Sequence, residues 1–358
     1  MLLPEFWRHG ETRRASLSPF HWLAYGRESL RVSPCLSKVK VLLGALTDLN
    51  DRIDRNALRV RRPKHTVFLC GGVISEDTNQ KSVLSIRDYL VRHRNIGKNV
   101  SADIVLAETA QQLYRDTNYP DLISFEEDVA SIASIVLVIS ESPGSLAELG
   151  AFASEPIIRE ALRLIVSEKH NDDESFVRYG PVRRIENIDR ERIGIFPWRN
   201  HKKNNFVVKR SIAPHYREVI RFINDKIEQI PDSHLYRTLG EERLFYDILW
   251  VISLFEAAPP DPLYQAVKVL HPHLHDDDIR KRLYILRTCR WIRSFSYAGR
   301  DFSYLQKNID PYEYAFLPDR RVRDVAATRL AIATEFKDGA QLTPAILKRL
   351  AEKRREQS

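Results

Sequence analysis

The stretch SIVLVISESPGSLAELGAF, residues 134–152, decides the fold of this chain. Its first six residues are almost entirely apolar and predict a buried β-strand, and the following SPG predicts a tight turn. A helix is then expected to begin at Ser145 and to carry Glu148 in its first turn. Ligands of open α/β sheets bind at the carboxyl ends of the strands, where helix N-termini present free amide groups. The stretch therefore predicts an α/β fold with a candidate acidic site at this edge.

Glu148 allows two interpretations. Ser145-x-x-Glu148 has the spacing of a capping box, in which the serine and the glutamate each accept a hydrogen bond from the other's backbone amide. This structural role explains neither Pro143-Gly144 nor Gly150, because a glycine inside a helix costs roughly 1 kcal/mol relative to alanine. Gly150 predicts a close approach to the backbone by a ligand or a neighbouring strand. The residues alone leave both roles of Glu148 open.

Short apolar segments alternate with helical segments between residues 66 and 214. Strands are predicted at 66–69, 103–107, 134–139, 162–166 and 192–196. Such strands separated by helices are typical of a parallel sheet covered on both faces. The simplest arrangement is flavodoxin-like, with the strands in the spatial order 2-1-3-4-5 and the ends of strands one and three side by side. One crevice is then expected to hold Gly71, Gly72, Glu108, Ser142, Gly144, Ser145 and Glu148.

Helical patterns flank this α/β unit on both sides. Residues 1–65 predict a helical extension with one amphipathic helix, which either packs on the core or docks a partner. In the region 215–358, three helices and a hairpin over about 240–318 predict a winged helix-turn-helix, followed by two closing helices at 320–336 and 344–355. The third helix would be the recognition helix, with Arg280, Lys281, Tyr284, Arg287 and Trp291 on nucleic acid. Alternatively, Tyr284 and Trp291 pack under the hairpin.

Charge and cysteine content narrow the class of protein. The net charge is +8, but residues 1–66 carry 13 Lys and Arg against 6 Asp and Glu, and residues 201–358 carry 28 against 21, while the segment between them is acidic. Basic flanks favour a nucleic-acid partner over chance clustering. Three distant cysteines give no disulfide framework or zinc spacing, so no metal or cofactor is expected. With no signal peptide and no apolar run long enough to span a bilayer, a cytoplasmic location is expected.

Several motifs resemble a known family. VFLCGG at 67–72, the acid after strand two, SFEEDVASIASIVLVISESPGSLAELGAF at 124–152 and SFVRYGPVR at 175–183 resemble the effectors of one group of bacterial retrons. In that group, a nucleoside 2-deoxyribosyltransferase-like domain precedes a winged helix. The resemblance covers about residues 66–200. It implies an antiphage defence system in which this toxic effector works with a reverse transcriptase and its RNA-linked single-stranded DNA, in a higher-order assembly.

The resemblance also implies roles for individual residues. The glutamate of the E-L-G motif is the nucleophile of deoxyribosyltransferases and corresponds to Glu148. Glu108 and Glu126 stand where related effectors also carry acids, and Arg183 would contact a phosphate from a loop over the pocket, unless that loop is a plain turn. A related effector has aspartate where this chain has Ser134, so no sugar contact is assigned there. Cys70 is interpreted as a small core residue, because no histidine lies near it.

Two functions from different classes follow. The first is an N-glycosidase toxin that hydrolyses a nucleotide, with NAD the favoured substrate. A carboxylate can attack or stabilise the oxocarbenium-like anomeric carbon, and a second carboxyl group can protonate the base or activate water. The second is a nucleotide-sensing domain that couples to a winged-helix regulator and has no catalytic activity. A glutamate in the crevice favours the enzyme, since a sensor of anionic nucleotides gains nothing from a buried carboxylate there.

Overall fold

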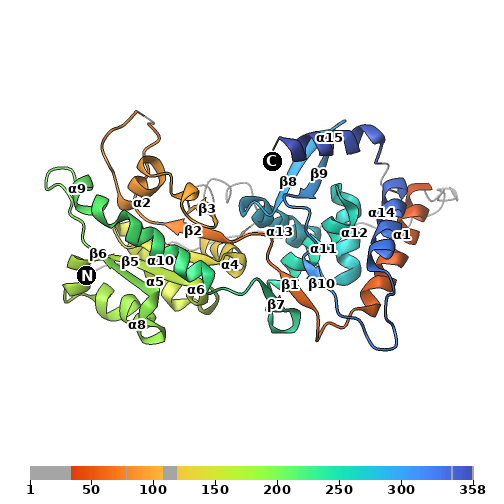
Figure 1. Cartoon of the computed structure of the whole chain (residues 1–358), viewed down its shortest axis with the longest axis horizontal. Helices are drawn as coiled ribbons and strands as arrows, with labels where there is room; N and C mark the ends of the chain where they lie inside the picture. Colours follow the sequence, from red (N-terminus) through yellow and green to blue (C-terminus); the bar gives the residue numbers. More distant parts are fainter. Residues whose placement is uncertain (1–33, 78, 108–118, 340–341, 357–358) are drawn as a thin grey trace, which may run out of the picture.

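The computed structural model describes residues 34–77, 79–107, 119–339 and 342–356. They form two lobes that lie side by side (Figure 1). One lobe is built on a parallel sheet, and the other is mostly helical. None of the helices in the described ranges combines the length and the apolar character needed to cross a lipid bilayer.

The sheet of the α/β lobe has five strands in the order β3-β2-β4-β5-β6, and every neighbouring pair is parallel. The strands are β2 (Thr66–Cys70), β3 (Asp103–Leu106), β4 (Ile135–Ile139), β5 (Leu162–Ser167) and β6 (Ile193–Phe196). This is the order 2-1-3-4-5 predicted from the sequence, which is thereby confirmed. All five strands end at one edge of the sheet, so the residues that follow β2 and β4 are neighbours there.

Helices cover both faces of this sheet (Figure 1). On one face, Val67, Leu69 and Leu137 pack in a cluster with residues of α2 (Ile86–Asp88), of its π-helical continuation Tyr89–His93 and of α10 (Tyr216–Glu228). On the other face, the alternate strand residues pack with α4 (Leu122–Ile132), α5 (Pro143–Ser154) and α6 (Pro156–Ala161). Because α10 covers the sheet, the α/β lobe extends past residue 214, where the sequence pattern had changed to helices.

Shorter elements complete the α/β lobe. They are α7 (Glu168–Asp172), the π-helical turn Arg178–Val182, α8 (Arg183–Ile188), α9 (Lys209–Ile212) and the 3-10 turns Ile96–Lys98, Arg190–Arg192 and Ala213–His215. The absence of a side chain matters at Gly194 in β6, because a Cβ there would lie 2.7 Å from the Phe196 ring.

The second lobe contains the three helices and the hairpin expected from the sequence. They are α11 (Arg243–Phe255), α12 (Pro260–Leu270), α13 (Asp276–Thr288) and the antiparallel pair β8 (Ile292–Tyr297) and β9 (Arg300–Leu305). A bridge between Ala258 and Ser303 ties the α11–α12 connection to the hairpin. The two closing helices are also present, as α14 (Val325–Gly339) and α15 (Pro344–Arg355).

The N-terminal segment belongs to this second lobe. Helix α1 (Pro34–Arg52) packs beside α14, and its Leu46 and Leu49 are fully buried. The strand β1 (Arg59–Arg61) is the middle strand of a small antiparallel sheet with β7 (Ser233–Leu235), which precedes the turn Tyr236–Thr238, and β10 (Tyr312–Glu313). Of the two roles left open for the predicted helix, core packing is the one observed.

A buried charge binds these distant segments together. Asp247 of α11 is 1% exposed and accepts hydrogen bonds from Tyr236 at 2.8 Å and from Tyr312. Arg55 lies 3.2 Å from the same carboxylate, and His271 Nε2 lies 2.6 Å from it. Burial opposes ionisation of this carboxyl group, but the hydrogen bonds and charges around it outweigh burial and lower the pKa of Asp247. Removing one partner would leave a buried charge uncompensated, so the network holds four chain segments in one arrangement.

Candidate active site

Helix α5 begins earlier than its sequence spacing predicts. Its N-cap is Ser142, whose Oγ accepts from the Ser145 amide at 3.1 Å, while Ser145 Oγ accepts from the Ser142 amide at 3.0 Å. Proline suits the first helical position because its missing N–H has no partner there in any case, and Pro143 occupies it. The capping box therefore lies at Ser142 and Ser145, and the predicted Ser145–Glu148 box is wrong. Glu148 sits one turn inside the helix and has no capping role.

Glu126 of α4 and Glu148 of α5 form a carboxyl pair in which Glu126 is buried, Glu148 is partly buried, and the charge of Glu148 acts on Glu126. Glu126 of α4 is 3% exposed, and its Oε1 has no hydrogen-bond partner among the described residues. The same is true of Glu148 Oε2 on α5. Burial, together with the negative charge of Glu148, raises the pKa of Glu126 to about 8. A buried carboxyl oxygen without a partner is costly, so these two atoms mark the pair as a candidate functional site.

Arg87 gives the two carboxyl groups different electrostatic surroundings. Its side chain is buried, and its Nε donates to the Gly72 carbonyl at 2.7 Å. Burial raises the pKa of Glu148, while the positive charge of Arg87 opposes that rise. Because the charge of Glu148 helps to raise the pKa of Glu126, the pair favours the arrangement with a proton on Glu126 and a charge on Glu148.

Cys70, at the end of β2, lies next to the pair and is fully buried. Burial, followed by the charges of Glu148 and Glu126, raises the pKa of its thiol well above the usual range. A protonated thiol is a poor nucleophile, so Cys70 fills space in the core, in line with its interpretation from sequence.

Glu141 is a site residue that sequence reasoning missed. It follows β4, and its Oε1 accepts hydrogen bonds from the Gly72 amide at 2.9 Å and the Arg87 amide at 3.0 Å, while its Oε2 accepts from the Ile86 amide. Burial raises the pKa of Glu141, and these three hydrogen bonds oppose the shift. The sequence did carry a signal for this residue, because Glu141 is an acid shortly after a central strand and opposite a glycine pair. Its carboxylate already accepts from the amide of Gly72, one of the two glycines that were predicted to lie in the crevice.

The glycine pair is required by packing within the protein. A Cβ on Gly71 would lie 3.1 Å from Arg87 Cβ, and one on Gly72 would lie 2.6 Å from Ser85 Cβ. Gly144 and Gly150 meet no such contact, because the nearest atom to a Cβ on Gly144 is 3.9 Å away and none lies within 4 Å at Gly150. Among the described residues no neighbouring strand crowds Gly150, so the predicted close approach by a strand is not observed, and the approach of a ligand stays a prediction.

We expect Gly72→Ala to destabilise the protein by about 1–3 kcal/mol, because the new methyl group must displace Ser85 from the turn before α2. Gly144→Ala is the matched control and should shift the stability by no more than about 0.5 kcal/mol. Chemical denaturation of both variants measures the difference. Equal midpoints would contradict the close packing of Gly72 on Ser85.

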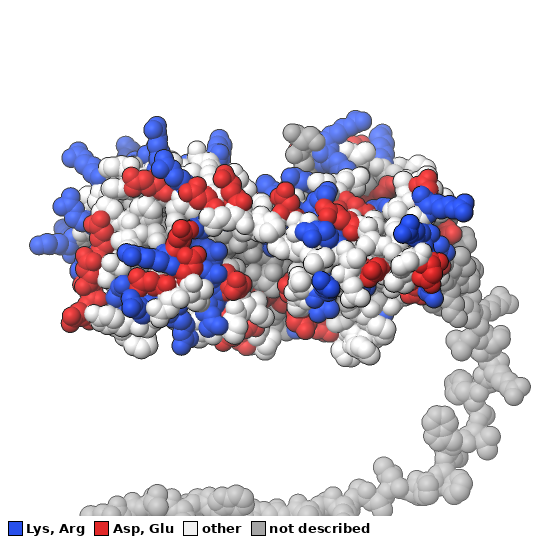
Figure 2. All heavy atoms as spheres, turned by 60° about the horizontal axis from the view of Figure 1, so that its bottom comes forward, with Lys and Arg blue, Asp and Glu red and all other residues white. Residues whose placement is uncertain are grey.

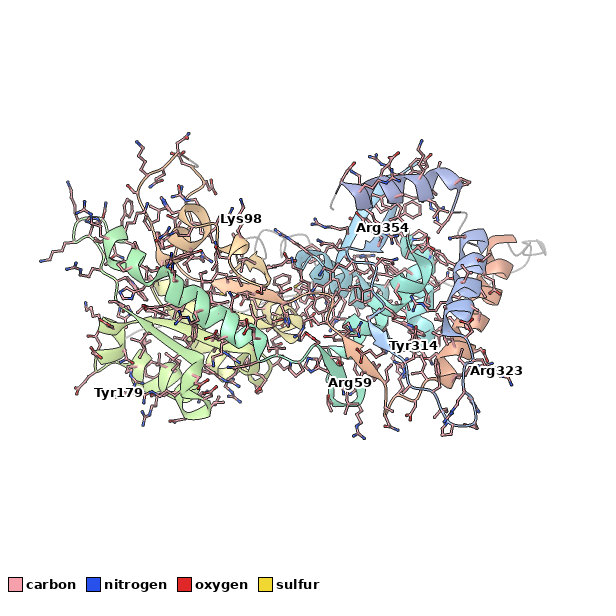
Figure 3. The ribbon with its side chains drawn as sticks, viewed as in Figure 1. Arg59, Lys98, Tyr179, Tyr314, Arg323 and Arg354 are labelled. Atoms are coloured by element: carbon pink, nitrogen blue, oxygen red, sulfur yellow. The ribbon has the colours of Figure 1, made fainter. Side chains whose placement is uncertain are left out.

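The remaining predicted binding residues are distributed differently. Ser142, Gly144 and Ser145 lie together at the start of α5, with Ser145 buried. Arg183 is 56% exposed, pairs with Glu186 at 3.0 Å and lines a separate hollow with Gly150 and Tyr179. Tyr179 lies at the outer edge of the lobe (Figure 3), and neither Glu126 nor Glu148 is among the lining residues of that hollow. Glu108 lies outside the described residues.

Ser134 lies at the opposite edge of the sheet from this site. It is the residue before β4, its Oγ lies 2.8 Å from His65 Nδ1, and its side chain is buried. No cluster of His, Cys, Asp and Glu suited to a metal ion occurs within the described residues.

The predicted recognition face of α13 is divided between two environments. Trp291 is 1% exposed, packs on Tyr246 at 5.9 Å between ring centroids, and donates its indole N–H to the Lys64 carbonyl at 3.0 Å. Tyr284 meets Phe125 of α4 at 6.3 Å between ring centroids. The placement of Trp291 on nucleic acid is therefore wrong, and Tyr284 packs on the α/β lobe and not under the hairpin.

The rest of α13 also bridges the lobes in part. Lys281 Nζ lies 5.2 Å from the centroid of the Tyr119 ring, and Arg282 lies 3.4 Å from Asp128 of α4. Arg280 is exposed and pairs with Asp277 of its own helix, while Arg287 is exposed in part and donates to the Leu283 carbonyl. Three of the five predicted residues are cationic. Lys281 contacts the α/β lobe, whereas Arg280 and Arg287 make these contacts within α13 itself.

Comparison with known proteins agrees with this geometry. The chain is 29% identical over 126 residues to an Escherichia coli protein named "Retron Ec86 putative ribosyltransferase/DNA-binding protein", which covers 35% of this chain and 39% of the relative. It is 27% identical over 122 residues to the Escherichia coli "Retron Ec73 putative ribosyltransferase/DNA-binding protein", and this alignment covers 34% of this chain and 38% of the relative. The chain thus matches about two fifths of the length of each. A family model described as STM3845 retron effector protein matches residues 83–294, which include Arg87, Glu126, Glu141 and Glu148. This match covers more than half of the chain, and the protein therefore belongs to the STM3845 retron effector family.

Proposed function

We propose that this retron effector is an N-glycosidase of the deoxyribosyltransferase-like type, which cleaves the base from a nucleotide, with NAD as the favoured substrate. The observation that carries the proposal is the pair of Glu126, which is buried and has a pKa raised to about 8, and Glu148, which is partly buried. Two relatives named as ribosyltransferases support chemistry at a glycosidic carbon. The pair lies at the carboxyl edge of a parallel sheet, where such folds bind ligands.

The two carboxyl groups divide the reaction between them. The Glu148 carboxylate attacks the anomeric carbon, a C–O bond forms as the C–N bond breaks, and the electron pair of the C–N bond leaves with the base. Burial raises the pKa of Glu148, and the positive charge of Arg87 opposes this rise and so favours the ionised form that attacks. A base that departs as an anion takes a proton from Glu126, whereas nicotinamide departs neutral from its cationic nucleotide and needs none.

Water then completes the reaction. Once Glu148 is an ester, it carries no charge, and one of the two causes that raise the pKa of Glu126 is gone. Glu126 then becomes a stronger acid: it has already given its proton to an anionic base, or it releases the proton to solvent after neutral nicotinamide has left. Its carboxylate can then accept a proton from the water that attacks the same carbon. The sugar is released with a hydroxyl group in place of the base, and Glu148 regains its negative charge.

A panel of nucleotides tests the proposal. The purified protein, alone and with its retron reverse transcriptase and RNA-linked DNA, is incubated with NAD, NADP, ribonucleotides and deoxyribonucleotides, and released bases are separated by chromatography. Release of nicotinamide from NAD is expected. If no nucleotide loses its base in either state, the enzyme proposal fails and the nucleotide-sensing regulator, a module without catalysis, takes its place.

The second lobe is proposed to be a winged helix that contacts the nucleic acid of the retron. Three helices followed by a hairpin, the bridge from Ala258 to Ser303 and the words "DNA-binding" in the relatives' names support this role. The effector would thereby join the reverse transcriptase and its RNA-linked single-stranded DNA in a higher-order assembly in the cytoplasm.

Association with this nucleic acid should weaken steeply with salt, because cationic contacts to phosphate release counterions. The double variant Arg280→Glu, Arg287→Glu is expected to reduce the affinity at least about tenfold, since it reverses two exposed cations of α13 whose contacts lie within their own helix. The matched control is Arg217→Glu, Arg221→Glu on the exposed side of α10. Fluorescence anisotropy with labelled DNA at several salt concentrations measures the effect. Affinity that ignores both salt and the α13 variant would assign the assembly to a protein surface.

A further inference from the structure

A hollow of about 490 Å³ lies at the carboxyl ends of β4, β5 and β6. Its lining comes from the residues directly after these strands and from α7: Glu141, Ser167, Lys169, His170, Trp198, Arg199, Asn200, His201, Lys202 and Asn205. The volume is that of a pocket for a small organic ligand. The carboxyl edge of an open parallel sheet is also the position at which this class of fold binds its ligands.

Cations dominate this hollow. Lys169, Arg199 and Lys202 are exposed, and within the described residues none of the three is paired with a carboxylate. Glu141 is the acid of the lining, and both of its oxygens are already held by the backbone amides of Gly72, Ile86 and Arg87. A concave surface that gathers three uncompensated cations attracts an anion. Lys and Arg side chains project from this outer end of the α/β lobe (Figure 2).

The hollow adjoins the carboxyl pair through two residues. Glu141 lines the hollow, and its carboxylate lies beside Arg87, whose charge acts on Glu148. Trp198, 9% exposed, supplies a ring at the wall of the hollow. A second hollow of about 380 Å³ shares His201 with the first and adds Lys81, Lys203 and Lys209. Further basic surface thus continues from the hollow beyond His201.

We propose that this hollow binds the diphosphate of the substrate, so that the enzyme acts on a free nucleotide with at least two phosphates and discriminates against nucleosides. This inference rests on the proposed glycosidase function for its biological meaning, but the anion site itself does not depend on catalysis. Each cation on a phosphate oxygen makes a charge-assisted hydrogen bond, which is the strong class of such bonds. The base and its sugar then extend from the diphosphate toward the Glu126–Glu148 pair.

Binding of inorganic pyrophosphate tests the site without any chemistry. Titration calorimetry compares the full-length protein, the double variant Lys169→Gln, Arg199→Gln and the matched control Arg217→Gln, Arg221→Gln. Loss of two charge-assisted contacts should weaken pyrophosphate binding at least about tenfold in the first variant and leave the control at the wild-type value. Pyrophosphate should also compete with the nucleotide, and the KM for the nucleotide should rise in the hollow variant. Equal pyrophosphate affinity in all three proteins would overturn the site.

Two further readouts separate the diphosphate site from the glycosidase proposal and from binding of a nucleic-acid strand. If no nucleotide is hydrolysed but pyrophosphate binding still depends on Lys169 and Arg199, the glycosidase proposal fails while the anion site stands. If the hollow variant loses affinity for a single-stranded oligonucleotide and keeps its affinity for pyrophosphate, the hollow contacts a nucleic-acid strand, and the diphosphate site is overturned.

Discussion

Glu148→Gln is expected to reduce base release at least about a thousandfold, because an amide can neither attack the anomeric carbon nor stabilise its positive charge. The side chain keeps its size, and Glu148 takes no part in the capping box of α5. A buried carboxyl group without a hydrogen-bond partner is replaced by a neutral group, so the folded protein should be at least as stable as the wild type. Chromatographic assay of the released base and thermal unfolding of the same sample measure both effects.

Glu174→Gln is the matched control for this substitution. Glu174 is an exposed residue of the same lobe, and its change should alter neither rate nor stability. If Glu148→Gln released base at the wild-type rate, the nucleophile would have to be sought elsewhere. An unfolded Glu148→Gln protein would instead show that the carboxylate stabilises the start of α5.

Glu126→Gln should change the pH dependence of the reaction. With a substrate whose base leaves as an anion, the wild-type rate should fall above a pH of about 8, where Glu126 loses its proton. The variant lacks this proton, so its rate should be about 10²–10⁴ lower and the fall above that pH should disappear. With NAD, the first step needs no proton. The variant should therefore release a burst of nicotinamide equal to the enzyme present and then turn over slowly.

The same substitution should alter the pH dependence of folding. Glu126 has a raised pKa in the folded protein, so between the usual value of 4.5 and about 8 the folded state holds a proton that the unfolded state has lost. Stability from this group is complete below 4.5, declines as the pH rises to about 8 and is constant above it. Glu126→Gln should thus become more stable than the wild type by up to a few kcal/mol as the pH rises through this window. Parallel stability curves for wild type and variant would contradict a protonated Glu126.

The order of the sheet could be predicted because each strand is a short apolar run between helices, and buried parallel strands have no polar face to blur the pattern. The register of α5 could not, since serines at positions 142 and 145 both suit an N-cap and the sequence does not say which of them starts the helix. Pro143 was the deciding residue, because proline is favoured at the first helical turn.

Long-range contacts account for the other differences. Tyr284 lies on the basic helix α13 and Trp291 follows its end, and aromatic residues in such a segment fit both a nucleic-acid face and a packed interface. Their partners, Tyr246 and Phe125, come from distant segments that periodicity does not connect. Glu141 was missed for the same reason, since its role depends on amide groups some 55 residues earlier in the chain.

The small sheet β10-β1-β7 has a consequence for how the chain folds and for how it can be divided. Because β1 lies directly beside β7 and α1 packs on α14, the α/β lobe is inserted into a domain built from the two flanking segments. A fragment that starts after β1 would leave Asp247 without Arg55 and the small sheet without its middle strand. During synthesis, the inserted lobe emerges whole before α11 to α14 exist, so it can fold while the segment 34–61 waits for its partners. The chain connects the lobes twice, after β1 and before β7. Any movement between the lobes must bend both of these adjacent connections at once, and this favours a hinge over free rotation.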